Sequence, residues 1–276
     1  MGYLEKPDVR ALVEQLSRGV EQLGDAGKWE EFLAAQARFH RYSFANTMLI
    51  LQQCPDATTV AGFNTWRGAG RVVRRGERAI WIVAPILHRR IKASAEPEIA
   101  GFRRVAVFDL SQTEGDELLT LCAPLEGGDD RGWFEVLADV AIALDFSVER
   151  SDLANGVFGD CTYASRRIRV ALTASPAQAV KTLAHELAHA LLHENTDDRP
   201  LAELEAESVA YVVCQHLGLD TTCYSFGYVT TWAGGTSVAL RAIKGSCTRI
   251  ADTARVIIDL AFPTTLSDGT QTVRAA

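Results

Sequence analysis

The sequence lacks the features of a secreted or membrane-spanning protein. No stretch of about 18 apolar residues occurs in its 276 residues, which excludes a membrane-spanning helix. The first eight residues, Met-Gly-Tyr-Leu-Glu-Lys-Pro-Asp, contain no apolar run and do not form a signal peptide. We therefore expect a cytoplasmic protein with no membrane partner.

The sequence also lacks any Cys-x-x-Cys pair. Its six cysteines are scattered, which favours small buried residues in a reducing compartment over a disulfide framework or a zinc ribbon. The net charge of −7 argues against a protein that coats DNA with its whole surface. The apolar fraction of 47% and charged fraction of 23% are typical of a globular protein, and the length fits two modest domains.

What the sequence does contain is a His-Glu-x-x-His pattern at residues 185–189. His185 and His189 are four residues apart, so on an α-helix both imidazoles lie on one face and can bind one metal ion. Glu186 lies next to His185, where its carboxylate can take a proton from a metal-bound water. The pattern predicts a metal site with Glu186 as the catalytic base.

The residues around this pattern predict a buried helix. Ser175 suits the N-cap, Pro176 suits the first helical position, and Gln178 would complete a capping box with Ser175. Apolar residues then recur at helical spacing up to Leu192. Short strands are expected before the helix, at residues 147–150, 161–163 and 167–170, and their free edge could bind an extended peptide.

A catalytic zinc site needs three protein ligands and one open position. The helix expected from residue 201 onward carries Glu203, Glu205 and Glu207. On a helical wheel Glu203 lies closest to the apolar stripe, Glu207 next, and Glu205 on the far side. We expect Glu203 to bind the metal, Glu207 to orient a histidine or to be the alternative ligand, and Glu205 to be a solvated charge.

Zn²⁺ is the expected ion, with Mn²⁺ or another divalent ion as the alternative. His193 lies eight residues beyond His185, about 12 Å along a helix, so we expect a polar residue near the helix C-terminus rather than a ligand. Tyr224 and Tyr228 are candidates for stabilising an oxyanion.

A basic segment precedes the metal motif. Residues 71–85 are expected to form a strand, a turn and a strand. Arginines can follow phosphates and aromatic rings can stack on bases, so this segment is a candidate site for single-stranded DNA. The candidate residues are Phe63, Trp66, Arg67, Arg71, Arg74, Arg75 and Arg78. The alternative is a solvated charged surface whose aromatic residues belong to the core.

Several runs of residues, in order, resemble ArdC-type antirestriction proteins. In the first half these are residues 41–55, 60–66 and 107–115, together with the segment that contains Gly76. The second half is similar to ImmA/IrrE-type zincins in His-Glu-Leu-Ala-His-Ala-Leu-Leu-His and Glu-Ala-Glu-Ser-Val-Ala. The resemblance implies a cytoplasmic protein whose N-terminal domain binds single-stranded DNA and whose zincin-like domain carries a metal, while proteolysis is not general in the group.

We therefore expect an α+β protein in which N-terminal helices with a small antiparallel sheet precede a zincin-like (gluzincin) metallopeptidase domain. The expected bounds are 1–123 for the DNA-binding domain, 124–132 for a linker, 133–262 for the metallopeptidase domain and 263–276 for a loose tail. The expected function is antirestriction or DNA-associated proteolysis of an unknown protein or peptide. The alternatives are a non-catalytic protein that masks DNA and has a structural metal, and a regulatory metalloprotease that cleaves a repressor.

Overall fold

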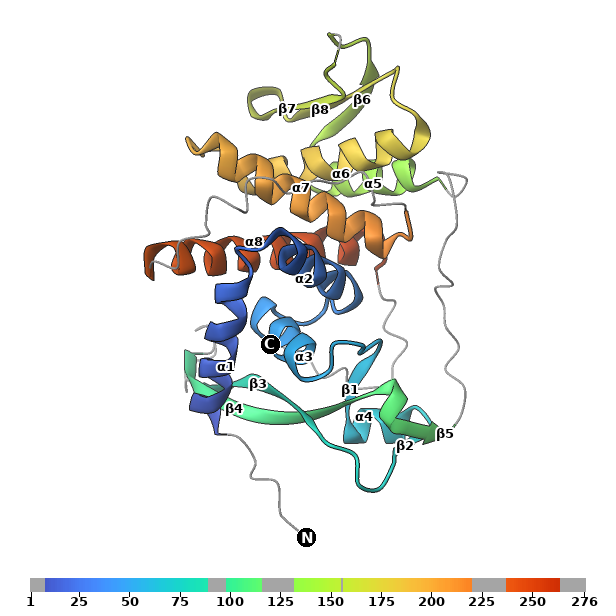
Figure 1. The fold of residues 1–276 in the computed structure, drawn as a ribbon. Coiled ribbons are helices and arrows are strands. Elements are labelled where there is room, and N and C mark those ends of the chain that lie inside the picture. The colour runs from blue at the N-terminus through green and yellow to red at the C-terminus, as the bar shows by residue number, and fades with distance from the viewer. Residues whose placement is uncertain (1–7, 89–97, 116–131, 155, 220–236, 264–276) are drawn as a thin grey trace. The chain divides into compact units, whose positions relative to one another are not determined.

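The computed structural model describes residues 8–88, 98–115, 132–154, 156–219 and 237–263. They fold into two compact units, which divide the chain after residue 22, after residue 40 and between residues 115 and 132 (Figure 1). Both units combine helices with a small sheet, so the predicted α+β class is confirmed. No helix within the described ranges is long and apolar enough to cross a membrane.

In the part of the first unit that the structure describes, there are a three-stranded antiparallel sheet in the order β1-β4-β3, a two-stranded sheet β2-β5 and three helices. Its helices are α1 (Val9–Gln22), α3 (Phe44–Gln53) and α4 (Phe63–Gly68), and its strands are β1 (Val60–Gly62), β2 (Arg71–Val73), β3 (Ile80–His88), β4 (Glu98–Asp109) and β5 (Thr113–Gly115). Apolar residues that alternate along β3 and β4, such as Ile80, Ile82 and Val107, are buried. Helix α3 packs against β3, and helix α1 packs against both strands.

Two amides of α3 bind the backbone of β3, which is an edge strand of its sheet. The side chain of Asn46 accepts a hydrogen bond from the Val83 N–H (3.0 Å) and donates one to the Val83 carbonyl (2.9 Å). Gln53, seven residues later on α3, makes the same pair of bonds with Trp81, each at 2.9 Å. These amides satisfy backbone groups that an edge strand would otherwise leave without protein partners.

The strands of residues 71–85 do not form the expected hairpin. Strand β2 pairs with β5, with Val72 opposite Glu114, while β3 pairs with β4. A short turn between β2 and β3 would allow these strands to pair. However, β2 has only three residues, while β4 has twelve and therefore offers β3 a longer partner. The sequence pattern of residues 71–85 therefore predicted both strands correctly, but β3 pairs with β4 and not with β2.

Asp109 fixes the turn that follows β4. Its side chain is buried (1% exposed) and accepts hydrogen bonds from the N–H groups of Thr58, Thr59 and Ser111, at 2.8, 3.1 and 2.8 Å. Its own N–H donates to the side chain of Gln112 at 2.9 Å, which completes a capping box on the short turn η1 (Leu110–Gln112). Asp109 therefore joins the segment before β1 to the end of β4.

The described residues of the second unit form five helices and a mixed sheet in the order β6-β8-β7. Its helices are α2 (Ala26–Arg38), α5 (Trp133–Ala143), α6 (Pro176–Leu192), α7 (Arg199–His216) and α8 (Ser237–Ala261); its strands are β6 (Ser147–Ser151), β7 (Gly159–Thr162) and β8 (Arg167–Ala171), with a short turn η2 (Tyr163–Ser165). The three predicted strands are all present; β6 runs parallel to β8 and β7 antiparallel to it. Helix α7 contacts α2, α6 and α8.

Helix α2 belongs to the second unit, although the predicted N-terminal domain of residues 1–123 includes it. The Trp29 indole N–H of α2 donates to the Ser208 hydroxyl of α7 at 3.2 Å, and both residues are fully buried. Trp29 and Phe32 are both fully buried, which explains why α2 belongs to the second unit. The sequence does not show which segment buries these two side chains. The predicted linker and tail lie outside the described residues, apart from Gly132 and Pro263, so those boundaries stay predictions.

We expect Asp109→Asn to lower the free energy of unfolding by about 1–3 kcal/mol at neutral pH, because the new amide NH₂ cannot accept the Ser111 N–H. Burial alone would raise the pKa of Asp109, but the hydrogen bonds it accepts hold this pKa below its ordinary value. The stabilisation by the carboxylate is therefore present above about pH 4 and is lost as the pH falls below it. Urea unfolding of both proteins from neutral pH downward should show a difference that shrinks in acid; a constant difference would contradict this assignment.

Candidate metal centre

Helix α6 begins where the sequence predicts. The Ser175 hydroxyl accepts a hydrogen bond from the Gln178 N–H at 3.3 Å, and Pro176 occupies the first turn. The capping box is only half formed, because the Gln178 side chain donates to the Thr182 hydroxyl (3.0 Å) and does not return to the cap. Most of the helix is buried, including Leu183 and Leu187, which fixes the face that its histidines present.

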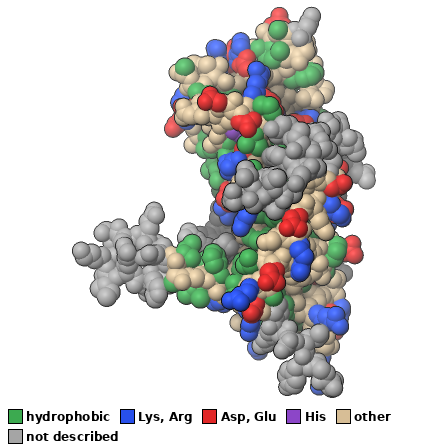
Figure 2. Space-filling view, turned by 60° about the vertical axis from the view of Figure 1, so that its left-hand side comes forward, with side chains coloured by type: hydrophobic (Ala, Val, Ile, Leu, Met, Phe, Trp, Pro, Cys, Tyr) green, Lys and Arg blue, Asp and Glu red, His purple; other side chains and the backbone are tan. Residues whose placement is uncertain are grey.

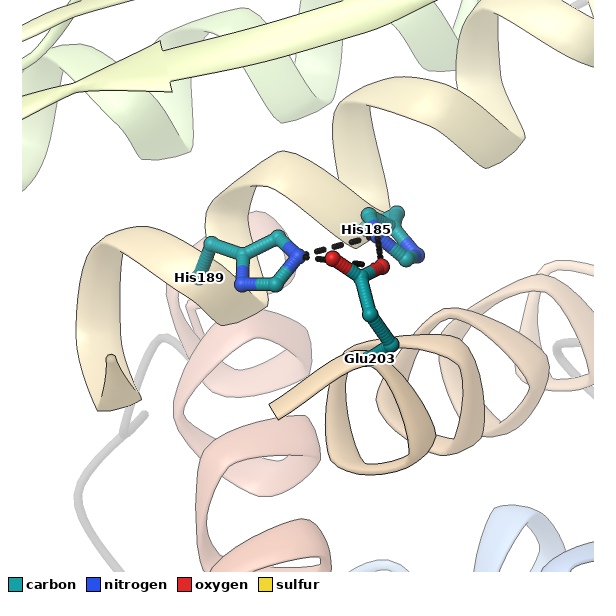
Figure 3. Close-up of side chains that lie close together, drawn as sticks. All are labelled: His185, His189 and Glu203. Carbon is teal, nitrogen blue, oxygen red and sulfur yellow. Dashed lines mark hydrogen bonds and ion pairs between the residues drawn. The ribbon is translucent and has the colours of Figure 1, made fainter. Parts of the chain in front are cut away.

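The structure brings His185, His189 and Glu203 together. The Nε2 atoms of the two histidines on α6 lie 3.0 Å apart. Glu203, in the first turns of α7, places its Oε2 3.4 Å from His185 Nε2 and 3.7 Å from His189 Nε2 (Figure 3). One ligand atom from each residue lies within 4.8 Å of the other two.

This donor set fits a small divalent ion. Bonds of 2.0–2.1 Å at tetrahedral angles would separate ligand atoms by about 3.3 Å, which lies within the observed range of separations. Burial lowers the pKa of His185, but the carboxylates of Glu203 and Glu207 outweigh burial and raise it to about 9. Hydrogen bonds with His185 and then His189 hold the pKa of Glu203 below its ordinary value. Two imidazoles surrounded by carboxylates form a site that attracts a cation.

Glu207 lies behind His185. Its Oε2 is 3.3 Å from His185 Nδ1, the ring nitrogen that does not face Glu203, and its Oε1 pairs with the Lys181 ammonium at 2.9 Å. Burial raises the pKa of Glu207, but the bonds with His185 and Lys181 outweigh it and lower the pKa. The sequence leaves open whether Glu203 or Glu207 completes the site. In the structure, Glu203 faces both histidines and Glu207 contacts only the far side of His185.

Glu186 lies at a cavity of ≈ 890 Å³ whose walls come from α6, β7 and the start of α7. The residue is 7% exposed, and burial raises the pKa of its carboxyl. Strand β7 approaches closely: a Cβ on Gly159 would lie 2.5 Å from Thr182 Cγ2 and 3.0 Å from Glu186 Oε1. Cys161 also lines the cavity, and burial raises the pKa of its thiol to about 12, which favours the protonated form.

Glu205 is buried, which corrects the expectation of a solvated charge. Its side chain is only 3% exposed and lies against Ser246 and Arg249 of α8. The helical wheel failed because α7 is covered on several sides, and α8 covers the face that the sequence assigned to solvent. Burial raises the pKa of Glu205, but the bonds with His193, Arg249 and Ser246 outweigh it and lower the pKa to about 2.

His193 caps the C-terminal end of α6, and its side chain is only 6% exposed. Its Nδ1 lies 2.9 Å from His189 Nδ1 and its Nε2 lies 3.2 Å from Glu205 Oε2. The spacing of four residues between His189 and His193 was the signal in the sequence that could have predicted this contact.

A second residue that the sequence did not identify is Tyr163, whose hydroxyl donates to the His189 carbonyl. Tyr224 and Tyr228 lie outside the described residues.

The residues predicted to contact single-stranded DNA fall into two groups in the structure. Some are buried or bonded to nearby residues, and the others are exposed. The Trp66 indole is 2% exposed and donates to the Phe108 carbonyl at 2.9 Å, which corrects the expectation that it stacks on bases. Arg71 donates to the Thr113 hydroxyl at 2.8 Å, and Arg74 pairs with Glu77 at 2.8 Å. The exposed candidates are Phe63, Arg67, Arg75 and Arg78.

Comparisons with protein families divide the chain into the same two halves as its motifs do. Residues 9–118 match the N-terminal domain of anti-restriction factor ArdC. Residues 141–214, which include the paired histidines, match the IrrE N-terminal-like domain of a peptidase family. The chain has an ArdC-type N-terminal domain followed by an IrrE-like domain. The resemblance predicted from the sequence is therefore confirmed for both halves.

Solved structures show the same ArdC-like fold. The metal-free crystal structure of antirestriction protein ArdC from the R388 plasmid matches with a TM-score of 0.53 and 21% identity, over 80% of this chain and 85% of that one. The Mn(II)-bound structure matches with a TM-score of 0.50 and 19% identity, over 81% and 90%. The uncharacterized protein pXO2-81 of Bacillus anthracis is 25% identical in an alignment 245 residues long, which covers 71% of this chain and 41% of that protein.

We expect Gly159→Ala to destabilise the IrrE-like domain by about 1–3 kcal/mol, because the added methyl overpacks β7 against α6. Thr182→Ser removes the methyl nearest to the new Cβ and keeps the hydroxyl that accepts from Gln178. The double variant should therefore recover part of the loss in thermal denaturation. If Gly159→Ala is as stable as the wild type, the close approach of β7 is not required.

Proposed function

We propose that this chain is a divalent-metal-dependent peptidase that acts in association with single-stranded DNA. The observation that carries the proposal is the convergence of His185, His189 and Glu203 beside a buried glutamate at a cavity. These three residues would hold the ion. Two imidazoles and a carboxylate suit Zn²⁺, and the Mn(II)-bound relative supports Mn²⁺ as the alternative.

Glu186 is the proposed general base. When bound, the ion supplies a Lewis acid for the scissile carbonyl and makes an attacking water more acidic. The buried carboxylate of Glu186, with its raised pKa, takes a proton from that water and returns it to the leaving amine. Its position at the cavity wall, beside the histidines but outside the group of ligand atoms, supports this role.

Strand β7 is the proposed binding edge for the substrate. It lies at the edge of its sheet, and no described strand pairs with its outer side. Gly159, Asp160 and Cys161 of β7 line the same cavity as Glu186. An extended peptide can add to such an edge by backbone hydrogen bonds, which would carry its carbonyl groups past Glu186. The substrate class that fits is an extended segment of a polypeptide.

Single-stranded DNA is the proposed partner of the ArdC-type domain. The match to an anti-restriction factor supports a function on DNA. The face seen in Figure 2 shows Lys and Arg side chains interspersed with Asp and Glu side chains, so a broad basic surface is not what we propose. We propose instead a local contact at Arg67, Arg75 and Arg78, with the exposed ring of Phe63 available for stacking on a base.

We expect Glu186→Gln to reduce peptide hydrolysis by about 10²–10⁴-fold and to leave metal binding unchanged, because the amide cannot act as a base. Casein cleavage and self-cleavage should be measured with Zn²⁺ or Mn²⁺, with and without single-stranded DNA, together with bound metal per chain. Equal cleavage by both proteins would contradict a role for Glu186. Metal binding without cleavage in the wild type under every condition would favour the non-catalytic DNA-masking function.

We expect the pair of substitutions Arg75→Gln and Arg78→Gln to weaken binding of single-stranded DNA and to reduce its salt dependence, because two phosphate contacts are lost. Fluorescence anisotropy over a salt series measures both effects. Arg10→Gln with Arg18→Gln, which removes two exposed arginines of α1, is the matched control. An equal loss in the control pair would show that net charge, and not this surface, governs binding.

A further inference from the structure

The imidazole of His189 is contacted at both of its ring nitrogens. Its Nε2 faces His185 and Glu203, as the preceding distances show. Its Nδ1, on the other side of the ring, lies 2.9 Å from Nδ1 of His193. His193 is not part of the group of converging ligand atoms among the described residues, so its contact is with the back of His189 and not with the proposed ion.

Behind His193 lies the buried carboxylate of Glu205, which pairs with the partly exposed Arg249. The second ring nitrogen of His193 is 3.2 Å from Glu205 Oε2, and the two side chains are 6% and 3% exposed. Arg249 Nε donates to both oxygens of Glu205, at 3.1 Å each, and the Ser246 hydroxyl donates to Oε1. A buried carboxylate with an arginine and a hydroxyl as partners is held as an anion in one orientation.

Each of these contacts needs one donor and one acceptor, which limits where the ring hydrogens can lie. An ionised carboxylate only accepts hydrogen bonds, so Nε2 of His193 carries the hydrogen that faces Glu205. With His193 neutral, its Nδ1 is an acceptor, so the hydrogen between the two rings belongs to Nδ1 of His189. His189 is left with a lone pair on Nε2, the nitrogen that faces Glu203.

We propose that His193, Glu205 and Arg249 are positioning residues that orient His189 and fix its tautomer for binding of a divalent ion. The inference rests on the proposed metal site. Each of the two histidines then has a carboxylate behind it. Glu207 contacts His185 directly, and Glu205 acts on His189 through His193. Ser246 and Arg249 belong to α8, so this helix supports the site although it lies beyond the residues that match the IrrE-like family.

The test is the dissociation constant for Zn²⁺ and for Mn²⁺, measured on the full chain by competition with a chromogenic chelator. We expect His193→Phe, which keeps a ring but has no nitrogen, to weaken binding by about 10–100-fold. His193→Gln keeps one acceptor and one donor and should lose less. Glu205→Gln should also weaken binding, while Glu194→Gln, an exposed neighbour with the same change of charge, should not.

Two further readouts separate positioning from stability. The loss of metal affinity in each variant should be larger than its loss of stability, measured as the thermal midpoint Tm of the metal-free protein, can explain. The ¹⁵N chemical shifts of His189 in the metal-free wild type should report a proton on Nδ1. Unchanged affinity of His193→Phe and Glu205→Gln would overturn the inference, as would a loss of affinity that only follows a loss of Tm. If His193→Phe does not fold, His193→Gln and Glu205→Gln decide by the same criteria. Failure of the wild type to bind either ion would instead contradict the proposed function itself.

Discussion

The pairing of half-buried imidazoles on α6 with carboxylates on α7 is the interaction on which the IrrE-like domain depends. His185 and His189 lie in a helix that is largely buried, where unpaired polar groups would be costly. Helix α7 supplies carboxylates at alternate positions, and each meets a different partner. Glu203 lies between the histidines, Glu207 lies behind one of them, and Glu205 faces away toward α8.

The third of these carboxylates connects the site to the remainder of the domain. A buried glutamate is tolerated only when its charge is matched, and here the match comes from α8. The geometry of the candidate metal centre therefore depends on α8 as well as on the two helices that carry the ligands. Strand β7 adds a further constraint, because Gly159 lets the sheet lie directly over Glu186 and close the wall of the cavity.

In the ArdC-type domain the corresponding constraint is an edge strand. Asn46 and Gln53 of α3 bind the backbone of β3, and Asp109 joins the segment before β1 to the end of β4. Several residues that look like nucleic-acid contacts in the sequence serve this framework instead. Trp66 and Arg71 bond to the chain around β4 and β5, which leaves the neighbouring exposed arginines as the available cations.

The sequence by itself determined the fold class, the limits of helix α6, the paired histidines and the first glutamate that joins them. Those features depend on local spacing: four residues set one helix face, and Ser175 with Pro176 sets a helix start. Only the tertiary structure decided the partners. Helix α8 turned Glu205 from a surface charge into a buried one, β4 replaced β2 as the partner of β3, and α2 packed on α7 through Trp29. These outcomes depend on contacts between segments far apart in the chain, for which the period of one segment carries no information.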